Sequence, residues 1–158
     1  VKALGLRLPL IWRLTEPYHA FHSHALGRSV RHGYHALARD ETRAAFEPVL
    51  WSVAPDHPGI VEQVWFPGTH GDVGGQIGGC ADSRPLSNIS RVWMLGKLES
   101  CGVVMPEGWR DRFPCDATAP SCGTWLGLRG LFLMRRARQR GKDASEREYE
   151  PRRSTPAE

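Results

Sequence analysis

Residues 61–75 read V-E-Q-V-W-F-P-G-T-H-G-D-V-G-G, and the interpretation of the whole chain depends on this stretch. Its first half, up to Phe66, is rich in β-branched and aromatic residues, a composition typical of a largely buried β-strand. A Pro-Gly pair then ends the strand, so a polar cluster that contains His70 and Asp72 follows its carboxyl end directly. In open α/β sheets, ligands and catalytic groups collect at that edge. The stretch therefore predicts an α/β fold with a candidate site on this loop.

His70 is the candidate catalytic residue. A histidine on a strand-end loop can act as a general base, which takes the proton from a nucleophilic hydroxyl and returns it to the leaving group. The nearby glycines allow tight backbone turns that a Cβ would forbid. The alternative is a loop histidine that only hydrogen-bonds the backbone of Gly74 and Gly75.

Three segments of the sequence resemble one known family. P-G-T-H-G-D-V-G-G (67–75) is similar to the G-x-H-x-D-V-G-G signature of an α/β-hydrolase-like family that includes type VI secretion phospholipase effectors of the type-1 lipase kind. The resemblance extends upstream to R-H-G-Y-H-A-L-A-R-D-E-T-R-x-x-F-x-P-V-L-W (31–51) and downstream to P-L-S-N-I-S-R-V-W-M-L (85–95). It therefore covers most of the first 100 residues.

The resemblance implies a serine hydrolase that acts on a lipid, a phospholipid or another ester, with His70 as its catalytic histidine. In α/β-hydrolases the nucleophile and the acid precede the histidine along the chain. No G-x-S-x-G elbow occurs in this sequence, and V-K-A-L-G (1–5) resembles the segment that follows an aspartate-containing W-D-T-V motif in relatives. We therefore expect residues 1–141 to be the C-terminal portion of an incomplete α/β-hydrolase-like domain, a parallel sheet flanked by helices. Such a fragment would be inactive alone, and its partner would be the missing N-terminal part of the same domain.

Asp72 allows two interpretations. Its carboxylate could hold His70 in place and raise its basicity, or it could cap the following turn through backbone amides. The chain order of α/β-hydrolases assigns the triad acid to another segment, which favours the second interpretation. We therefore expect a supporting role in the loop for four residues, namely Gly68, Asp72, Gly74 and Gly75.

Two helices are predicted on either side of the central strand. The first is expected to begin after Ser29 as its N-cap, because apolar residues recur at i, i+4, i+7 and i+8. These residues are Val30, Tyr34, Leu37 and Ala38. The second helix is expected over residues 86–101, with Ser87 or Asn88 as its cap.

The segment between the first helix and the central strand is expected to be short and irregular. Asp40, Glu41 and Arg43 match the D-E-x-R pattern of the resembling family, and such a cluster predicts an ion-pair and capping arrangement. A short helical turn should stop at Pro48, and residues 49–51 could form a short edge segment.

The segment 125–140, from Trp125 to Arg140, is apolar first and basic afterwards. It could form a helix that contacts a membrane surface. Because its apolar and basic residues follow one another rather than lie on opposite faces, we favour an apolar stretch packed on the sheet, with basic residues at a helix end. The segment lacks interleaved aromatic residues and nucleic-acid-binding motifs, so we expect no nucleic-acid partner. The alternative to an enzyme is a non-catalytic binding or membrane-surface module that retains a hydrolase-fold remnant.

Histidines and cysteines indicate no metal site or other cofactor. Five histidines have spacings that a zinc site could use, but we favour a polar connection near the rim of the site over a metal site for them: His19, His22, His24, His32 and His35. The four cysteines form no C-x-x-C pair.

Composition and length indicate one soluble globular domain. The chain has 158 residues, of which 41% are hydrophobic and 24% charged. Neither a signal peptide nor an apolar run of about 20 residues is present, so we expect a cytoplasmic protein, although the parent could be exported as an effector. Residues 142–158 are charged, contain proline and are predicted to form a disordered tail.

Overall fold

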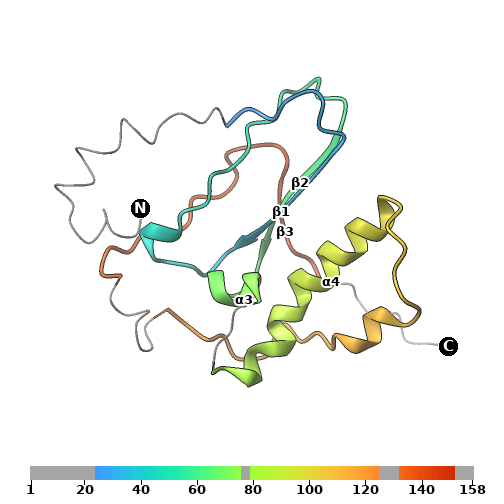
Figure 1. Cartoon of the computed structure of the whole chain (residues 1–158). Helices are drawn as coiled ribbons and strands as arrows, with labels where there is room; N and C mark the ends of the chain where they lie inside the picture. Colours follow the sequence, from blue (N-terminus) through green and yellow to red (C-terminus); the bar gives the residue numbers. More distant parts are fainter. Residues whose placement is uncertain (1–23, 76–78, 125–131, 152–158) are drawn as a thin grey trace.

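The computed structural model describes residues 24–75, 79–124 and 132–151 of the chain (Figure 1). In this part of the chain, three parallel strands form one sheet in the order β1-β2-β3. Strand β1 spans His32–Ala38, β2 spans Ile60–Phe66 and β3 spans Glu146–Glu148. The short helix α3 (His70–Gly74) follows β2 directly, and helix α4 (Arg84–Ser100) packs against one face of the sheet. The predicted α/β fold, a parallel sheet flanked by helices, is confirmed.

Short 3-10 helices connect these elements. They are η1 (Ala44–Phe46), η2 (Ala81–Ser83) and η3 (Trp109–Arg112). The helical turn predicted before Pro48 corresponds to η1, which ends two residues before that proline. None of the described helices is long and apolar enough to cross a membrane.

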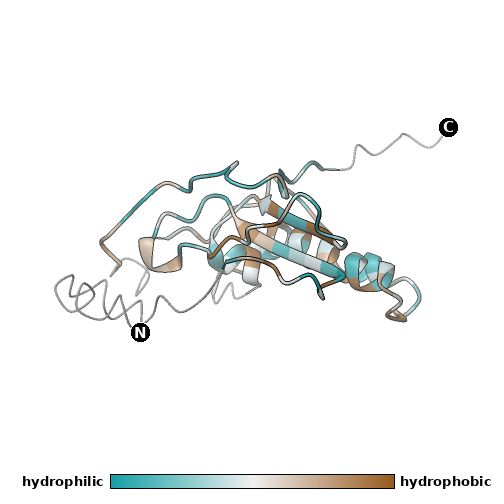
Figure 2. Ribbon diagram, turned by 90° about the horizontal axis from the view of Figure 1, so that it is seen from above, coloured by the Kyte–Doolittle hydropathy of each residue, from teal (hydrophilic) through white to brown (hydrophobic). Residues whose placement is uncertain are grey.

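The hydrophobic core lies between the sheet and α4. Val64 and Phe66 point from β2 toward the helix and pack with Leu86 and Ile89. The ring of Trp93 on α4 meets the Phe66 ring edge-on, with 5.2 Å between centroids. In Figure 2 the apolar residues of the strands and of α4 alternate with polar ones, as expected for elements that bury one face.

Helix α4 forms where the sequence predicts a helix but begins earlier. Ser83 occupies the N-cap position and Pro85 lies in the first turn, where its missing N–H costs no hydrogen bond. The predicted caps are therefore wrong, because Ser87 and Asn88 are buried inside the helix. The Asn88 side chain instead donates a hydrogen bond of 2.9 Å to the carbonyl of Pro114.

The helix predicted after Ser29 is wrong, because residues 32–38 form strand β1. Apolar residues at helical spacing also satisfy a strand here: Tyr34 faces Trp93 of α4, whereas Leu37 is buried on the opposite face beside Trp65. Continuous pairing with β2, from His32 opposite Ile60 to Ala38 opposite Phe66, decides between the two conformations. Tertiary pairing thus overrides a local spacing that both structures accommodate.

The buried side chain of Gln63 holds the loop around Trp51 against the second face of the sheet. Gln63 of β2 is fully buried, and its amide accepts a hydrogen bond from the Trp51 N–H (2.8 Å) and donates one to the Trp51 carbonyl (2.9 Å). The same amide donates to the Ser145 hydroxyl. The edge segment predicted at residues 49–51 is therefore a loop held by a side chain, and only the neighbouring Ser52 forms a β-bridge, with Ala25.

Strand β3 lies inside the segment that the sequence assigns to a disordered tail. Its residues are charged, but Trp65 donates a hydrogen bond of 2.8 Å to the Glu146 carboxylate, which also accepts the backbone amides of Gly141, Lys142 and Asp143. Composition alone carries no information about such pairing with a buried neighbour. The sheet therefore extends beyond residue 141, whereas residues 152–158 lie outside the described part of the chain.

Candidate active site

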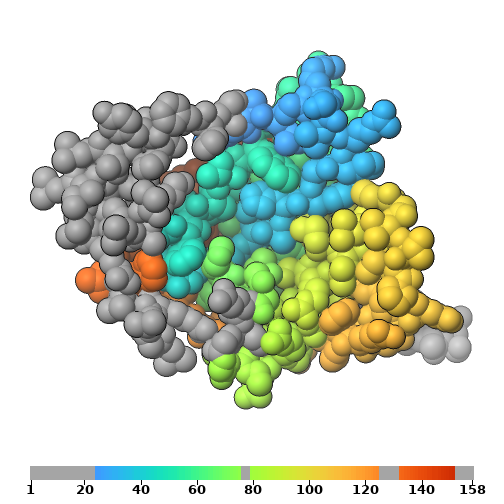
Figure 3. Space-filling model, viewed as in Figure 1, coloured from blue at the N-terminus to red at the C-terminus, as the bar shows by residue number. Residues whose placement is uncertain are grey.

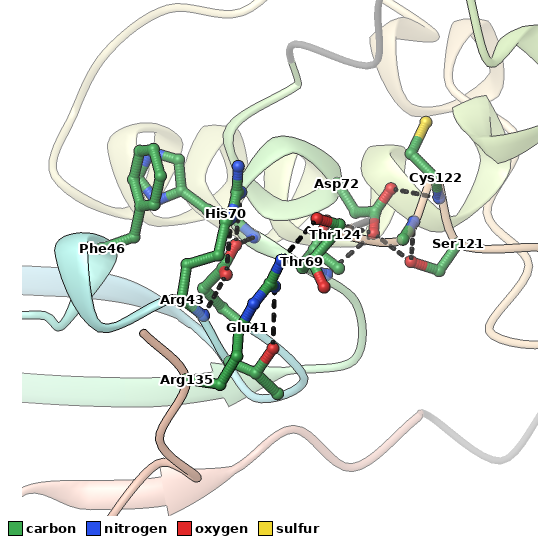
Figure 4. A network of polar contacts seen from close by, with 12 residues as sticks. Glu41, Arg43, Phe46, Thr69, His70, Asp72, Ser121, Cys122, Thr124 and Arg135 are labelled. Atoms are coloured by element: carbon green, nitrogen blue, oxygen red, sulfur yellow. Dashed lines mark hydrogen bonds and ion pairs between the residues drawn. The ribbon is translucent and has the colours of Figure 1, made fainter. Parts of the chain in front are cut away.

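The carboxyl ends of β1 and β2 carry the candidate site. Since the strands are parallel, the loops that follow them leave the sheet at the same edge. Asp40 ties these loops together: its backbone N–H donates to the Gly68 carbonyl (3.0 Å), and its carboxylate accepts the Gly68 N–H (2.7 Å). His70 begins α3 two residues later (Figure 4).

Two of the predicted supporting glycines adopt backbone conformations that other residues avoid. Gly68 has a φ of 103°, and a Cβ there would lie 2.7 Å from the Cβ of Asp72. Gly75 ends α3 in the left-handed region, with a φ of 79°. Gly74 lies in α3 with open space around the position of a Cβ. The turns into and out of α3 therefore depend on Gly68 and Gly75.

Asp72 is fully buried, and its carboxylate is occupied by hydrogen bonds that do not involve the His70 ring. It accepts the Thr69 N–H (2.7 Å) and hydroxyl (2.8 Å), which caps α3, and it also accepts the Ser121 hydroxyl (2.5 Å) and the Cys122 N–H (3.1 Å). Burial alone would raise the pKa of Asp72, but the donors outweigh burial and hold it below its usual value. This geometry matches the capping interpretation.

His70 presents its imidazole at the edge of the sheet. Its backbone N–H donates to the Glu41 carboxylate (3.1 Å), and its ring packs on Phe46 with 4.8 Å between centroids. The ring nitrogens make no hydrogen bond with the described residues, and the residue is exposed. Partial burial against its neighbours lowers the pKa of His70, Arg43 and Arg138 lower it further, and Glu41 opposes them. An imidazole that is neutral at pH 7 can accept a proton, as a general base must.

Glu41 and Arg43 form a buried ion pair beside His70. Their residues are 1% and 6% exposed. The Arg43 guanidinium donates two hydrogen bonds to Glu41, of 2.9 and 2.6 Å, and the Arg43 backbone donates a third. Desolvation would raise the pKa of Glu41, but the donors from Arg43 and His70 lower it. The ion-pair and capping arrangement predicted for the D-E-x-R cluster is therefore present.

An extended segment from the C-terminal third of the chain borders the site. The Arg136 N–H donates to the Thr42 carbonyl (2.7 Å), the Ala44 N–H to the Met134 carbonyl (3.0 Å), and Arg138 to the carbonyl of Phe46 (2.8 Å). Figure 3 shows this segment, in orange, against the surface of η1. The helix expected in residues 125–140 is wrong for residues 132–140, which are extended, and residues 125–131 lie outside the described part.

Among the residues that the structure describes, no hydroxyl or thiol is hydrogen-bonded to the His70 ring. Ser121, which follows in the chain, donates its hydroxyl to Asp72 rather than to His70. Within residues 24–75, 79–124 and 132–151, no group of three or more His, Cys, Asp or Glu side chains could hold a metal ion. His32 and His35 lie on opposite faces of β1, and His19 and His22 lie outside the described residues.

An open cavity of about 660 Å³ lies at the opposite edge of the sheet. Residues 28–32 and 58–60 line it, at the amino ends of β1 and β2. It is therefore separate from the edge that carries His70.

Several contacts of the site leave no signal in the sequence around His70. Phe46, Phe132 and the Ser121–Cys122 pair come from segments far from His70 along the chain, and no local pattern connects them to it. The acidic pair Asp40–Glu41 becomes a signal only once residues 32–38 are recognised as a strand, because the pair then follows that strand at the same edge of a parallel sheet as His70.

The fold belongs to the α/β class. Its parallel sheet carries an exposed histidine, His70, at the start of α3, the helix that follows the central strand β2. The family model described as "T6SS, Phospholipase effector Tle1-like, catalytic domain" matches residues 1–97, more than half of the chain. The chain belongs to this family. No curated protein and no solved structure matched the chain.

Replacing the Asp72 carboxylate tests its role as an anchor, that is, as the group that caps α3 and binds Ser121 and Cys122. Because the pKa of Asp72 is lowered in the folded chain, its contribution to stability is complete above the ordinary value of 3.8 and is lost as the pH falls through the folded value. Asp72→Asn should therefore reduce the free energy of unfolding at pH 7 by about 2 kcal/mol or more, and by less near about pH 3. Urea unfolding followed by tryptophan fluorescence measures both.

Asp56→Asn is the matched control. Asp56 forms an exposed ion pair with Arg28, so its loss should change the stability by less than about 1 kcal/mol. An equal loss of stability for Asp72→Asn at both pH values would contradict the anchoring role of the charged carboxylate.

Proposed function

We propose that this chain supplies the catalytic histidine of a serine ester hydrolase of the phospholipase type. The observation that carries the proposal is the His70 imidazole, which is exposed at the carboxyl edge of a parallel sheet and has ring nitrogens free of hydrogen bonds to the described residues. Membership of a family described as phospholipase effectors supports a lipid ester as the substrate class.

In the proposed reaction His70 moves one proton twice. Its neutral ring nitrogen accepts the proton of a serine hydroxyl while the serine oxygen attacks the ester carbonyl. As the ester bond to the leaving alcohol breaks, the imidazolium returns the proton to the alcohol oxygen, leaving an acyl-enzyme that water cleaves by the same steps. The serine and the triad acid would come from an N-terminal part of the same domain, which is the proposed partner of this chain.

The proposed role of His70 is tested by mutation in the longest in-frame protein that contains this chain. His70→Ala should lower ester hydrolysis by about 10⁴-fold or more, because removing a triad base abolishes proton transfer. The measurement is hydrolysis of a phospholipid and of a short-chain ester, with circular dichroism to verify folding.

His24→Ala is the matched control for this experiment. His24 is exposed, and its backbone carbonyl accepts the Ser52 N–H on the loop between β1 and β2, so its removal should leave the rate unchanged. Equal activity of the His70→Ala and wild-type proteins would refute the proposed role. Absence of activity in both would favour the non-catalytic binding module.

A separate prediction concerns the enzymatic activity of the 158-residue chain by itself. It should not hydrolyse esters or react with a fluorophosphonate probe, since neither a G-x-S-x-G elbow nor a serine bonded to His70 occurs among the described residues. Gel fluorescence after probe labelling measures this, with a known serine esterase as the positive control. Labelling that disappears in His70→Ala would show that the chain carries its own nucleophile.

We further propose that the site faces a lipid surface. Leu133 and Met134, next to Phe132 at the border of the site, are 79% and 46% exposed. The exposed guanidinium of Arg136 follows them and could meet anionic headgroups. Phe132 packs on Phe46, whose ring contacts His70, so this apolar pair lies on the same side of the molecule as the candidate base.

Binding to vesicles tests the lipid-facing surface. Serine substitutions at both Leu133 and Met134 should weaken binding to anionic phospholipid vesicles about tenfold, because their apolar side chains would no longer enter the interface. Sedimentation of the chain with vesicles measures the affinity. Val104→Ser, at a position 94% exposed beyond the end of α4, should leave it unchanged, and an equal loss in this control would contradict the assignment.

A further inference from the structure

Two residues of the loop between β1 and β2 contact His70, one at its backbone and one at its ring. We propose that Glu41 and Phe46 are positioning residues for His70, Glu41 for its backbone and Phe46 for its ring. The proposal rests on the proposed role of His70 as a base and adds the residues that would hold that base.

Glu41 fixes the backbone of the histidine. Its carboxylate is buried and accepts four hydrogen bonds, three from Arg43 and one from the N–H of His70. A buried charge remains ionised only with such partners, and the geometry needed to keep them leaves little freedom for the donors. The end of β1 is thereby attached to the first residue of α3, and His70 cannot shift without breaking a hydrogen bond to a buried carboxylate.

Phe46 fixes the plane of the imidazole. The two rings are inclined by 40° with centroids 4.8 Å apart, so the phenyl ring covers one face of the imidazole. Phe46 itself is confined by the Arg43 guanidinium, 4.1 Å from its centroid, and by the Phe132 ring at 5.2 Å. Arg138 holds its backbone carbonyl. Contact at one face orients the ring and leaves both nitrogens available for a substrate or a triad partner.

Arg43 couples the two positioning residues. The same guanidinium donates to Glu41 and lies over the Phe46 ring, so charge pairing and ring contact depend on one side chain. The charged groups that act on His70 are Glu41 from the end of β1, Arg43 before η1 and Arg138 from the extended segment. Asp72 of α3 is occupied by donors other than the His70 ring, and Arg135 donates to Thr42 and Thr124.

The two contacts act on the His70 proton affinity in opposite directions, which gives a sharp test. Glu41 stabilises the protonated ring, so Glu41→Gln should move the pKa of His70 further down. Burial lowers the pKa of His70 and Phe46 packs on its ring. Phe46→Ala, which removes that cover, should therefore move the pKa of His70 up toward the ordinary value of 6.5 and remove the ring-current shift of its protons. Phe46→Tyr, which retains an aromatic ring, should preserve both properties.

The experiment is an NMR titration of the histidine rings in the 158-residue chain, with the His70 signals assigned by their loss in His70→Gln. His35 is the internal control. Its ring packs on Trp51, on the face of β1 opposite α4, and burial there lowers its pKa without a contribution from Glu41 or Phe46. A variant that merely unfolds would return the pKa of both histidines to the ordinary value. Opposite shifts at His70 with an unchanged His35 are the expected result.

Unchanged His70 signals in both variants would overturn the proposal. An upward shift in Glu41→Gln with His35 unchanged would overturn the assignment of Glu41. Since the titration requires no catalysis, it separates the two ideas: if His70→Ala hydrolyses esters as fast as wild type while the opposite shifts are seen, the proposed function fails and the positioning stands.

Discussion

The parallel pairing of β1 with β2 is the constraint on which the candidate site depends. It brings the carboxyl ends of two strands, separated by a loop of 21 residues from position 39 to position 59, to one edge of the sheet. Asp40 and Glu41 at the end of the first strand then reach the backbone of Gly68 and His70 after the second. Antiparallel pairing would put these groups at opposite ends of the sheet. The parallel direction of the two strands is therefore the first requirement for assembling the site, and the contacts between side chains come second.

Residues beyond the family match contribute to the sheet and to the surroundings of the candidate site. Strand β3 extends the sheet, Ser121 and Cys122 bind Asp72, and the segment from residue 132 covers η1, all beyond the match at residues 1–97. Asp72 therefore has two functions in the fold: it caps α3 and attaches a segment 49 residues later in the sequence. The shape of the loop that carries His70 consequently depends on contacts from both parts of the chain.

The sequence predicts those elements whose signals are local. Strand β2 has a dense β-branched and aromatic composition, and α4 has a long apolar period, so both appear where expected. Strand β1 does not, because Tyr34 and Leu37 fit a helical period as well as two faces of a strand, and only pairing with β2 distinguishes them. Strand β3 is not visible in the sequence because its residues are charged, and the contact that fixes Glu146 to the sheet comes from Trp65, which is distant in the sequence. His70 could be predicted as a candidate residue because it directly follows the local signal of β2. Its contact with Phe46 could not be predicted, because it joins residues that are distant in the sequence.

The buried amide of Gln63 has a consequence for how the molecule opens. It binds both polar backbone groups of Trp51, so a loop without regular structure is hydrogen-bonded to a fully buried side chain of the central strand. Because the same amide also holds Ser145 beside β3, the loop and the last strand cannot separate from β2 independently of each other. We therefore expect the amides of this loop and of β3 to exchange their hydrogens in one shared opening event rather than in separate local fluctuations.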